Sequence, residues 1–258
     1  MHIRSLGLAT DLELAKTRGQ VIDRDGYLVV RTPGDPSYYF GNLLVLPAAP
    51  QVGEVAYWTR KFASELGGDP AIRHVALRWD GIQGDTGATD ELLAAGFTVE
   101  VLQVMTAEGL DVAPCFYDIQ RLEPRHLIES AELEYAIGDV HDDKFRQFLH
   151  RRAAWKQSLL ASGRATFWGA FDKQTLVGSL GLVQLGTRGR YQDVQTAVAY
   201  RGQGIARGLL RAAAKASTAS ELVIVAEPRS QAARVYEQVG FRTVELVGSA
   251  CRYPVVSE

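Results

Sequence analysis

The residues with the clearest chemical meaning lie in a loop between a predicted strand and a predicted helix. The alternating β-branched run 194–198 predicts the strand, and the Ala, Leu and Arg residues of 208–216 predict the helix. In the loop, Gly202 and Gly204 allow a tight turn and leave no Cβ between a ligand and the main chain. The helix start adds N–H groups without intrahelical acceptors and the positive end of a dipole. Together these features predict a site for an anion such as a pyrophosphate.

The spacing of the loop residues distinguishes between classes of nucleotide site. No Lys-Ser or Lys-Thr pair follows the second glycine, which argues against a triphosphate-binding P-loop, and Arg207 stands where a dinucleotide fingerprint has glycine. Arg201-x-x-Gly204-x-Ala206 instead resembles the pyrophosphate-binding motif of the GNAT acetyltransferase superfamily, Arg/Gln-x-x-Gly-x-Gly/Ala. Charge-assisted hydrogen bonds from Arg201 or Arg207 would add to the backbone contacts.

A second sequence block that resembles the same superfamily follows at the expected distance. In the superfamily it consists of a strand, a helix carrying Ala-x-x-x-Tyr-Glu, and then Gly-Phe. In this chain the apolar run 222–226 predicts the strand, Ala232-x-x-x-Tyr236-Glu matches the helix, and Gly240-Phe follows. The two blocks together make the resemblance specific, and it covers roughly residues 110 to 258 directly.

The resemblance implies acetyl-CoA as co-substrate. In this superfamily the pantetheine arm pairs with the backbone of the cofactor strand, here around Thr196 to Val198, where the strands predicted over 189–198 and 222–226 splay apart. Arg229 stands where relatives commonly carry asparagine, so the pantetheine contacts at that point are open. The cofactor-binding residues predicted in this way are Thr196, Ala197, Val198, Arg201, Gly202, Gln203, Gly204, Ile205, Ala206, Arg207 and Arg229. No His/Cys cluster has metal-ligand spacing, so we expect no metal.

Two residues are candidates for catalytic proton transfer. The resemblance makes Tyr236 the predicted general acid, because a leaving thiolate with a reference pKa of about 8.5 can be protonated by a tyrosine within hydrogen-bond reach. The alternative is an aromatic core residue on a helix. Asp193 lies close to where some relatives place a carboxylate base, and its alternative role is a cap or an ion pair with Arg190.

A polar cluster, His141, Asp142 and Asp143, lies between two predicted helices, where substrates enter in this superfamily. Three polar residues at a helix start also serve as ordinary capping residues. Both interpretations of the cluster are open. The serine residues lack the context of a nucleophile elbow.

The secondary-structure pattern predicts an α/β fold. In the second half, one strand, helices over 124–137 and 142–160, three hairpin-connected strands and the cofactor strand, loop and helix follow in the superfamily order. The first half begins with a helix over 10–22 and strands over 27–31 and 38–46. We expect mixed, mostly antiparallel sheets flanked by helices, in two tandem acetyltransferase-like domains.

The first half repeats the second in reduced form. Strand, loop, helix, Gly-Phe and strand occur in the same order over 72–105 and 222–246, which indicates an internal structural repeat. Where the second half has the arginine and glycine motif, the first has Pro47 and Pro50, which remove amide donors. The first half is therefore predicted to be a degenerate acetyltransferase-like domain without a cofactor site.

The domain boundaries follow from this repeat. Residues 1–108 are expected to form the degenerate domain and residues 109–258 the domain that binds acetyl-CoA. The linker is predicted over 107–114.

The composition limits the partners. A net charge of −2 over 258 residues gives no basic field for nucleic acid and no polybasic patch for a membrane. No apolar run has the length of a membrane span, and the N-terminus lacks the apolar core of a secretion signal, so we expect a cytoplasmic protein. Cys115 and Cys251 are interpreted as small, buried, reduced residues.

These features predict an N-acetyltransferase that moves an acetyl group from acetyl-CoA to a primary amine of a small molecule or peptide. One alternative is a non-catalytic acyl-CoA-binding or regulatory protein, for which Tyr236 would be dispensable. An NAD(P)-dependent oxidoreductase is disfavoured, because its glycine-rich loop would lie near the start of a long parallel sheet. The identity of the acceptor and the oligomeric state stay open, with a homodimer among the alternatives.

Overall fold

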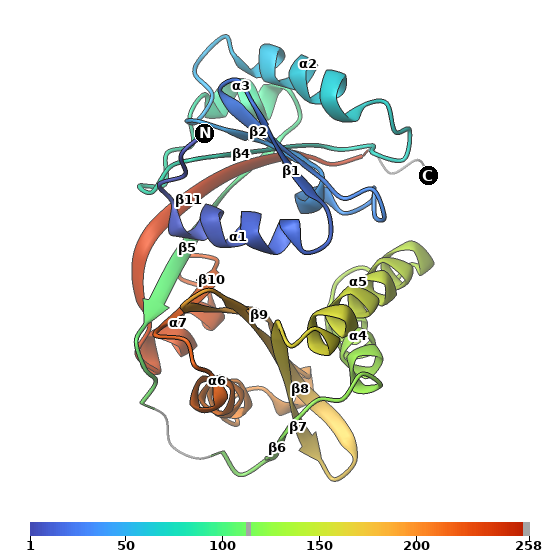
Figure 1. Cartoon of the computed structure of the whole chain (residues 1–258), viewed down its shortest axis with the longest axis vertical. Helices are drawn as coiled ribbons and strands as arrows, with labels where there is room; N and C mark the ends of the chain where they lie inside the picture. Colours follow the sequence, from blue (N-terminus) through green and yellow to red (C-terminus); the bar gives the residue numbers. More distant parts are fainter. Residues whose placement is uncertain (112–114, 255–258) are drawn as a thin grey trace. The chain divides into compact units, whose positions relative to one another are not determined.

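The computed structural model describes residues 1–111 and 115–254, and the contacts among them divide the chain into two compact units. Unit 1 holds Met1–Val104 and the residues from Thr243 onward, and unit 2 holds Met105–Arg242. Figure 1 draws both units.

The end of unit 1's first segment lies close to the expected boundary after residue 108, but the residues from Thr243 onward group with unit 1 by contact. They were expected in the second domain. These residues group with unit 1 because strand β11 (Arg242–Arg252) pairs with β4 (Val75–Trp79) of that unit. The pairing runs from Ser249 opposite Arg78 to Arg252 opposite Val75. Residues 112–114 of the predicted linker 107–114 lie outside the described residues.

Unit 1 is an α/β unit with two hydrophobic cores, one on each face of its sheet. Its strands lie in the order β1-β2-β3-β4-β11-β5. Strands β3 and β4 are parallel, whereas β1 and β2, β2 and β3, and β4 and β11 pair antiparallel. Alternation along β2 separates the cores, because Leu28 and Val30 pack with α1 residues whereas Tyr27 and Val29 pack with α2 and α3 residues. Its further elements are α1 (Leu6–Lys16), β1 (Gln20–Arg24), β2 (Tyr27–Arg31), β3 (Leu43–Leu46), α2 (Val55–Leu66), α3 (Thr89–Ala94) and β5 (Thr98–Ala107), whose last three residues belong to unit 2.

Two predicted elements of unit 1 differ from the structure. The helix predicted over 10–22 ends at Lys16, and Gln20–Arg24 forms β1, because Val21 and Ile22 pair with β2 in an antiparallel hairpin. The strand predicted over 38–46 is confined to Leu43–Leu46, since the Asn42 side chain holds the preceding segment in a loop. Its Nδ2 donates to the carbonyl oxygens of Asp35 and Tyr38, each at 3.0 Å.

Unit 2 has a mixed, mostly antiparallel sheet with strand order β10-β9-β8-β7-β6, in which β9 and β10 are parallel. Figure 1 shows α4 and α5 on one face of this sheet and α6 on the opposite face. The fold class expected for the chain is therefore confirmed. The elements of unit 2 are β6 (Asp118–Arg121), α4 (His126–Ile137), α5 (Asp143–Ala161), β7 (Ala165–Asp172), β8 (Thr175–Leu185), β9 (Arg188–Thr196), α6 (Ile205–Ala216), β10 (Glu221–Ala226) and α7 (Gln231–Gln238).

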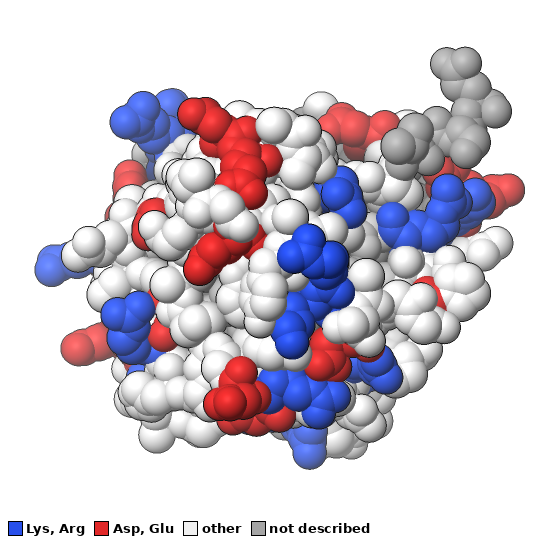
Figure 2. All heavy atoms as spheres, turned by 90° about the horizontal axis from the view of Figure 1, so that it is seen from above, with Lys and Arg blue, Asp and Glu red and all other residues white. Residues whose placement is uncertain are grey.

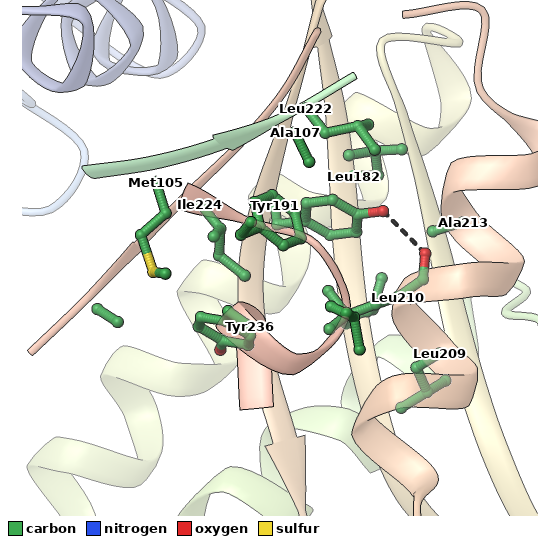
Figure 3. Packing of buried hydrophobic residues seen from close by; sticks show 14 of the residues in the cluster. Met105, Ala107, Leu182, Tyr191, Leu209, Leu210, Ala213, Leu222, Ile224 and Tyr236 are labelled. Carbon is green, nitrogen blue, oxygen red and sulfur yellow. Dashed lines mark hydrogen bonds between the residues drawn. The ribbon is translucent and has the colours of Figure 1, made fainter. Parts of the chain in front are cut away.

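The core of unit 2 fixes α6 and α7 against the sheet (Figure 3). Leu209, Leu210 and Ala213 of α6 are fully buried in this core. Tyr191 of β9 donates its hydroxyl hydrogen to the Leu210 carbonyl oxygen at 2.8 Å. Because this hydrogen bond lies in an apolar core, it sets the position of α6 along β9.

The cysteines differ from each other in burial. Cys251 is buried, as expected, whereas Cys115 is only partly buried. Cys115 lies beside Gly208 of α6, where an added Cβ would come within 2.4 Å of the cysteine Cβ. The Cys115 side chain therefore leaves room only for glycine at position 208.

Charged side chains of both signs are interspersed on the face in Figure 2. Among the helices of the described residues, none combines the length and the apolar character needed to cross a membrane.

Candidate functional site

Strands β9 and β10 separate after a short paired stretch, as the prediction of splayed strands requires. They pair from Arg188 opposite Glu221 to Arg190 opposite Val223, and no further pair joins them in the described part of the chain. A cavity of about 380 Å³ lies along the end of β9, bounded by the following loop, the start of α6 and α7. Eight predicted site residues line it: Thr196, Arg201, Gly202, Gly204, Ile205, Ala206, Arg207 and Tyr236.

The first turn of α6 presents backbone N–H groups to this cavity. Gly204 is the N-cap residue, with a φ of 83° and no side-chain capping bond. Gly202 also has a positive φ, 76°, and both values lie in the region that L side chains avoid. The N–H groups of Ile205, Ala206 and Arg207 precede the first intrahelical bond, which runs from Gly208 N to Gly204 O at 3.0 Å. This geometry suits a phosphate group.

Polar side chains hold the loop before α6. Arg201 Nε donates to the Thr196 carbonyl oxygen at 3.3 Å, and Gln203 Nε2 donates to the Ala199 carbonyl oxygen at 3.2 Å. The Tyr117 hydroxyl donates to Gln203 Oε1. Gln203 therefore braces the loop and is not among the residues that line the described cavity.

The predicted backbone contacts of the strand end need one correction. The N–H of Ala197 donates to the Val177 carbonyl oxygen at 2.9 Å, so this amide is used within the protein. Val198 lies in a short 3₁₀ turn after the strand and is 62% exposed. Of the three residues predicted to pair with pantetheine, Thr196 is the one that lines the cavity.

Tyr236 reaches the cavity from α7. Ser230 caps this helix by accepting a hydrogen bond from Ala233 N at 3.1 Å. The Tyr236 ring is buried beside Phe241, with ring centroids 6.2 Å apart, and its hydroxyl has no hydrogen-bond partner among the described residues. Burial raises the pKa of Tyr236 to about 12, against a smaller opposing effect of the Arg190 charge. The hydroxyl is thus a proton donor that stays protonated at neutral pH.

Asp193 is held by two cations of α5 and does not line the cavity. Arg152 Nη2 donates to Asp193 Oδ1, and Lys156 Nζ lies 2.8 Å from Oδ2. Burial alone would raise the pKa of Asp193, but the Arg152 and Lys156 charges outweigh it and hold the pKa well below its usual range. Such a carboxylate is a poor proton acceptor, which argues against the predicted general-base role. The expected ion-pair partner, Arg190, is also replaced by Arg152 and Lys156.

Strand β9 has a bulge at this point. The register runs from Ser179 opposite Gln195 to Gly181 opposite Gln192, so Asp193 and Val194 together face a single residue of β8. Asp193 has a φ of 52°, in the left-handed region. This bulge could not be predicted from the sequence, because its left-handed residue is not a glycine.

A buried polar cluster at the end of β9 was also missed from the sequence. Gln195 Nε2 donates to the Ser130 carbonyl oxygen at 2.9 Å and to the Ser179 hydroxyl at 2.8 Å. The hydroxyls of Ser130 and Ser179 are 2.9 Å apart. These bonds join α4, β8 and β9 beside the cavity, which Gln195 lines.

The remaining candidates lie away from the cavity lining. Arg229 has a φ of 62° and is exposed, so pantetheine contacts at this position stay a prediction. Asp142 caps α5 by accepting from Phe145 N at 2.7 Å, and the His141 ring lies 5.3 Å from the Tyr135 ring. Capping therefore accounts for Asp142. In residues 1–111 and 115–254, no group of three or more His, Cys, Asp or Glu side chains could hold a metal ion.

In the corresponding loop of unit 1, between β3 and α2, glutamate side chains of the same unit accept hydrogen bonds from backbone amides. The N–H of Gly53, with a φ of 89°, donates to Glu91 Oε2 at 2.6 Å. The N–H of Gln51 donates to Glu54 Oε2 at 2.9 Å. Two negative side chains thus take the amides that an anion would need, and they would repel it.

Residues 129–251 match the family model described as "Acetyltransferase (GNAT) domain". The chain carries a GNAT acetyltransferase domain. The matched segment includes every residue that lines the cavity, from Ile137 to Gln238. The resemblance inferred from the two sequence blocks is thereby confirmed. No curated protein matches the chain by sequence.

Several solved structures share the fold of this chain. A functionally unknown conserved protein from Staphylococcus epidermidis has a TM-score of 0.76 and 13% identity, over 92% of this chain and 95% of that chain. A GCN5-related N-acetyltransferase from Kribbella flavida has a TM-score of 0.66 and 12% identity, over 99% and 98%. A tandem GNAT protein from the clavulanic acid biosynthesis pathway has a TM-score of 0.54 and 13% identity, over 90% and 74%. At these identities the likeness concerns the fold.

Proposed function

We propose that unit 2 binds acetyl-CoA in the cavity along β9 and transfers the acetyl group to a primary amine of a small molecule or peptide. The observation that carries the proposal is that one cavity is lined both by the glycine-capped first turn of α6 and by the Tyr236 side chain. An anion-binding turn and a proton donor are the two groups that a CoA thioester requires in acyl transfer. The GNAT domain match supports the same chemistry.

The docking of the cofactor follows from the lining residues. The pyrophosphate would accept hydrogen bonds from the N–H groups of Ile205 and Ala206, with Arg201 and Arg207 supplying positive charge. The pantetheine arm would run along β9 beside Thr196, which pairs with no β10 residue in the described part of the chain.

The reaction is a nucleophilic substitution at the thioester carbon. The amine nitrogen attacks this carbon, the C–N bond forms and the C–S bond breaks, and the thiolate leaves. The nitrogen loses one proton and the thiolate gains one, so protons balance. Tyr236 is the donor to the thiolate, because its hydroxyl is protonated, lies in the cavity lining and has no competing acceptor among the described residues.

The proton of the amine has a different route. No carboxylate or imidazole of the described residues lines this cavity. We therefore propose that water takes the proton of the amine, and that the free amine is the reactive form of the acceptor.

Release of free CoA in the presence of a panel of amines tests the proposal, with mass spectrometry to identify the acetylated product. At least one amine should be acetylated by the full chain. Binding of acetyl-CoA without transfer to any amine would favour the acyl-CoA-binding alternative, and absence of binding would refute both.

A further inference from the structure

Gln195 lines the cavity with a side chain that is almost completely enclosed by the protein. The residue is only 7% exposed. Its Nε2 donates to the Ser130 carbonyl oxygen of α4 at 2.9 Å and to the Ser179 hydroxyl of β8 at 2.8 Å. Both hydrogens of the amide group are used in these bonds, so the Gln195 side chain is fixed in one position.

These contacts also decide the orientation of the Gln195 amide. A backbone carbonyl oxygen accepts hydrogen bonds and donates none, so the amide nitrogen must face Ser130 and the amide oxygen must face away from it. Oε1 accepts no hydrogen bond from the described residues, and it is not one of the side-chain atoms that the protein encloses completely. Because the cavity is the open space beside Gln195, Oε1 is an unused hydrogen-bond acceptor presented to that cavity.

An enclosed acceptor of this kind calls for a ligand that supplies an N–H group. Leaving the oxygen without a donor costs free energy, and a ligand N–H removes this cost. The proposed function brings two ligands with N–H groups to the cavity, the pantetheine arm of acetyl-CoA and the amine that receives the acetyl group.

The two faces of the sheet distinguish between these ligands. The Gln195 side chain lies on the face that α4 covers, since it bonds to Ser130. Tyr236 belongs to the core that contains Leu209 and Leu210 of α6, on the opposite face (Figure 1). In the proposed reaction Tyr236 donates to the leaving thiolate, and the attacking nitrogen forms a different bond of the same carbon. The group that faces Tyr236 across the sheet therefore suits the attacking nitrogen.

We infer that Gln195 Oε1 accepts a hydrogen bond from the attacking amine nitrogen and thereby makes the site specific for primary amines. The inference rests on the proposed function. As the C–N bond forms, the nitrogen of a primary amine carries two N–H groups. One donates to Oε1, and the other loses its proton to water. The partial negative charge of Oε1 also stabilises the positive charge that the nitrogen gains.

A secondary amine cannot satisfy both requirements. Its nitrogen carries one N–H group when the C–N bond forms, and this group cannot both donate to Oε1 and pass its proton to water. An N-methyl group would then face Oε1 and leave this enclosed oxygen without a donor. A site that is built to bond an N–H group rejects the analogue that lacks it.

The test compares primary and secondary amines in the full chain. Each primary amine of the CoA-release panel is paired with its N-methyl derivative, for example benzylamine with N-methylbenzylamine. The wild-type chain should favour the primary amine of the fastest pair by at least about tenfold in kcat/KM. Gln195→Met keeps the length of the side chain and removes the acceptor, so it should lower this preference at least about fivefold. The acetyl-CoA Kd should change less than about threefold.

The preference is a ratio measured in one protein sample, so a smaller folded fraction does not alter it. The matched control is Gln192→Met, the same change on the same strand. Gln192 Nε2 donates to the Tyr191 carbonyl oxygen at 2.8 Å, and Gln192 does not line the cavity. This variant should keep the wild-type preference. If Gln195→Met does not fold, its combination with Ser179→Ala removes the hydroxyl that would lose its donor, and the same reduction is expected.

The outcomes separate this inference from the proposed function. A wild-type preference below about tenfold, or a reduction below about fivefold in folded Gln195→Met or in the folded combined variant, overturns the role of Gln195 alone. An acetyl-CoA Kd raised more than about threefold in Gln195→Met but not in Gln192→Met assigns Oε1 to the pantetheine arm and also overturns that role. Failure of the wild-type chain to bind acetyl-CoA, or to acetylate any amine of the panel, overturns the proposed function itself.

Discussion

Replacing Tyr236 with phenylalanine removes one hydroxyl from the wall of the cavity and keeps the ring that packs beside Phe241. Because this hydroxyl has no hydrogen-bond partner among the described residues, its loss leaves no buried group unsatisfied there. The free energy of unfolding should therefore change by less than about 1 kcal/mol.

The rate should respond much more strongly. Loss of a proton donor to the thiolate should lower turnover by about ten- to a thousandfold, which corresponds to about 1.4 to 4 kcal/mol in the activation free energy. Because the pKa of Tyr236 is about 12, the wild-type hydroxyl stays protonated up to about pH 10, and the loss should be uniform over that range. The acetyl-CoA affinity should change little.

The assay is free-CoA release with an active acceptor, together with calorimetry of acetyl-CoA binding. Tyr191→Phe is the matched control, since it is the same chemical change at a buried tyrosine that donates to Leu210 and does not line the cavity. It should lower stability by about 1 kcal/mol and leave turnover per folded molecule unchanged. A wild-type rate in Tyr236→Phe, with the chemical step shown to limit turnover, would refute the donor role.

Two further predictions concern pH. Because no described carboxylate or imidazole lines the cavity, kcat/KM for the acceptor should rise about tenfold per pH unit up to the pKa of the acceptor amine. If the acid limb of the pH profile instead has the same pKa for amines of different basicity, this prediction is wrong. The folded-state pKa of Asp193 lies below its ordinary value, so its ionised form stabilises the fold above about pH 4, and that stability is lost as the pH falls further. Lowering the pH from 7 to 3 should therefore reduce the stability of the wild-type chain, measured by thermal unfolding, more than that of Asp193→Asn. Equal losses in the two proteins would contradict the ion-pair assignment.

The local features of the site were accessible from the sequence. Gly202 and Gly204 indicate left-handed backbone, and the spacing of Arg201, Gly204 and Ala206 matches the pyrophosphate-binding motif. The helix that carries Tyr236 has apolar periodicity and a serine cap, which are also local signals.

The long-range features were not accessible. The ion pair between Arg152 and Asp193 joins residues 41 positions apart, and it depends on how α5 lies against β9. The Ala197 amide is bonded to Val177 because of the strand register, which composition does not determine. Strand β1 was missed because its burial pattern is mixed, and only pairing with β2 makes Gln20–Arg24 a strand.

The loop of unit 1 shows the same limit. Pro47 and Pro50 correctly indicated fewer amide donors, but the sequence did not reveal that Glu91 would occupy the amide of Gly53. That contact joins residues 38 positions apart, and the Glu91 carboxylate would repel an anion from the loop of unit 1.

Calorimetric titration of the full chain with acetyl-CoA tests the central claim most directly, in the wild type, in Gly204→Val and in the matched control Gly53→Val. Both glycines have a positive φ, 83° and 89°, but only Gly204 lines the cavity of unit 2. We predict one acetyl-CoA per chain, at least about tenfold weaker binding in folded Gly204→Val, and unchanged binding in Gly53→Val. Two equivalent sites per chain, or an unchanged affinity in folded Gly204→Val, would contradict the assignment of the cavity.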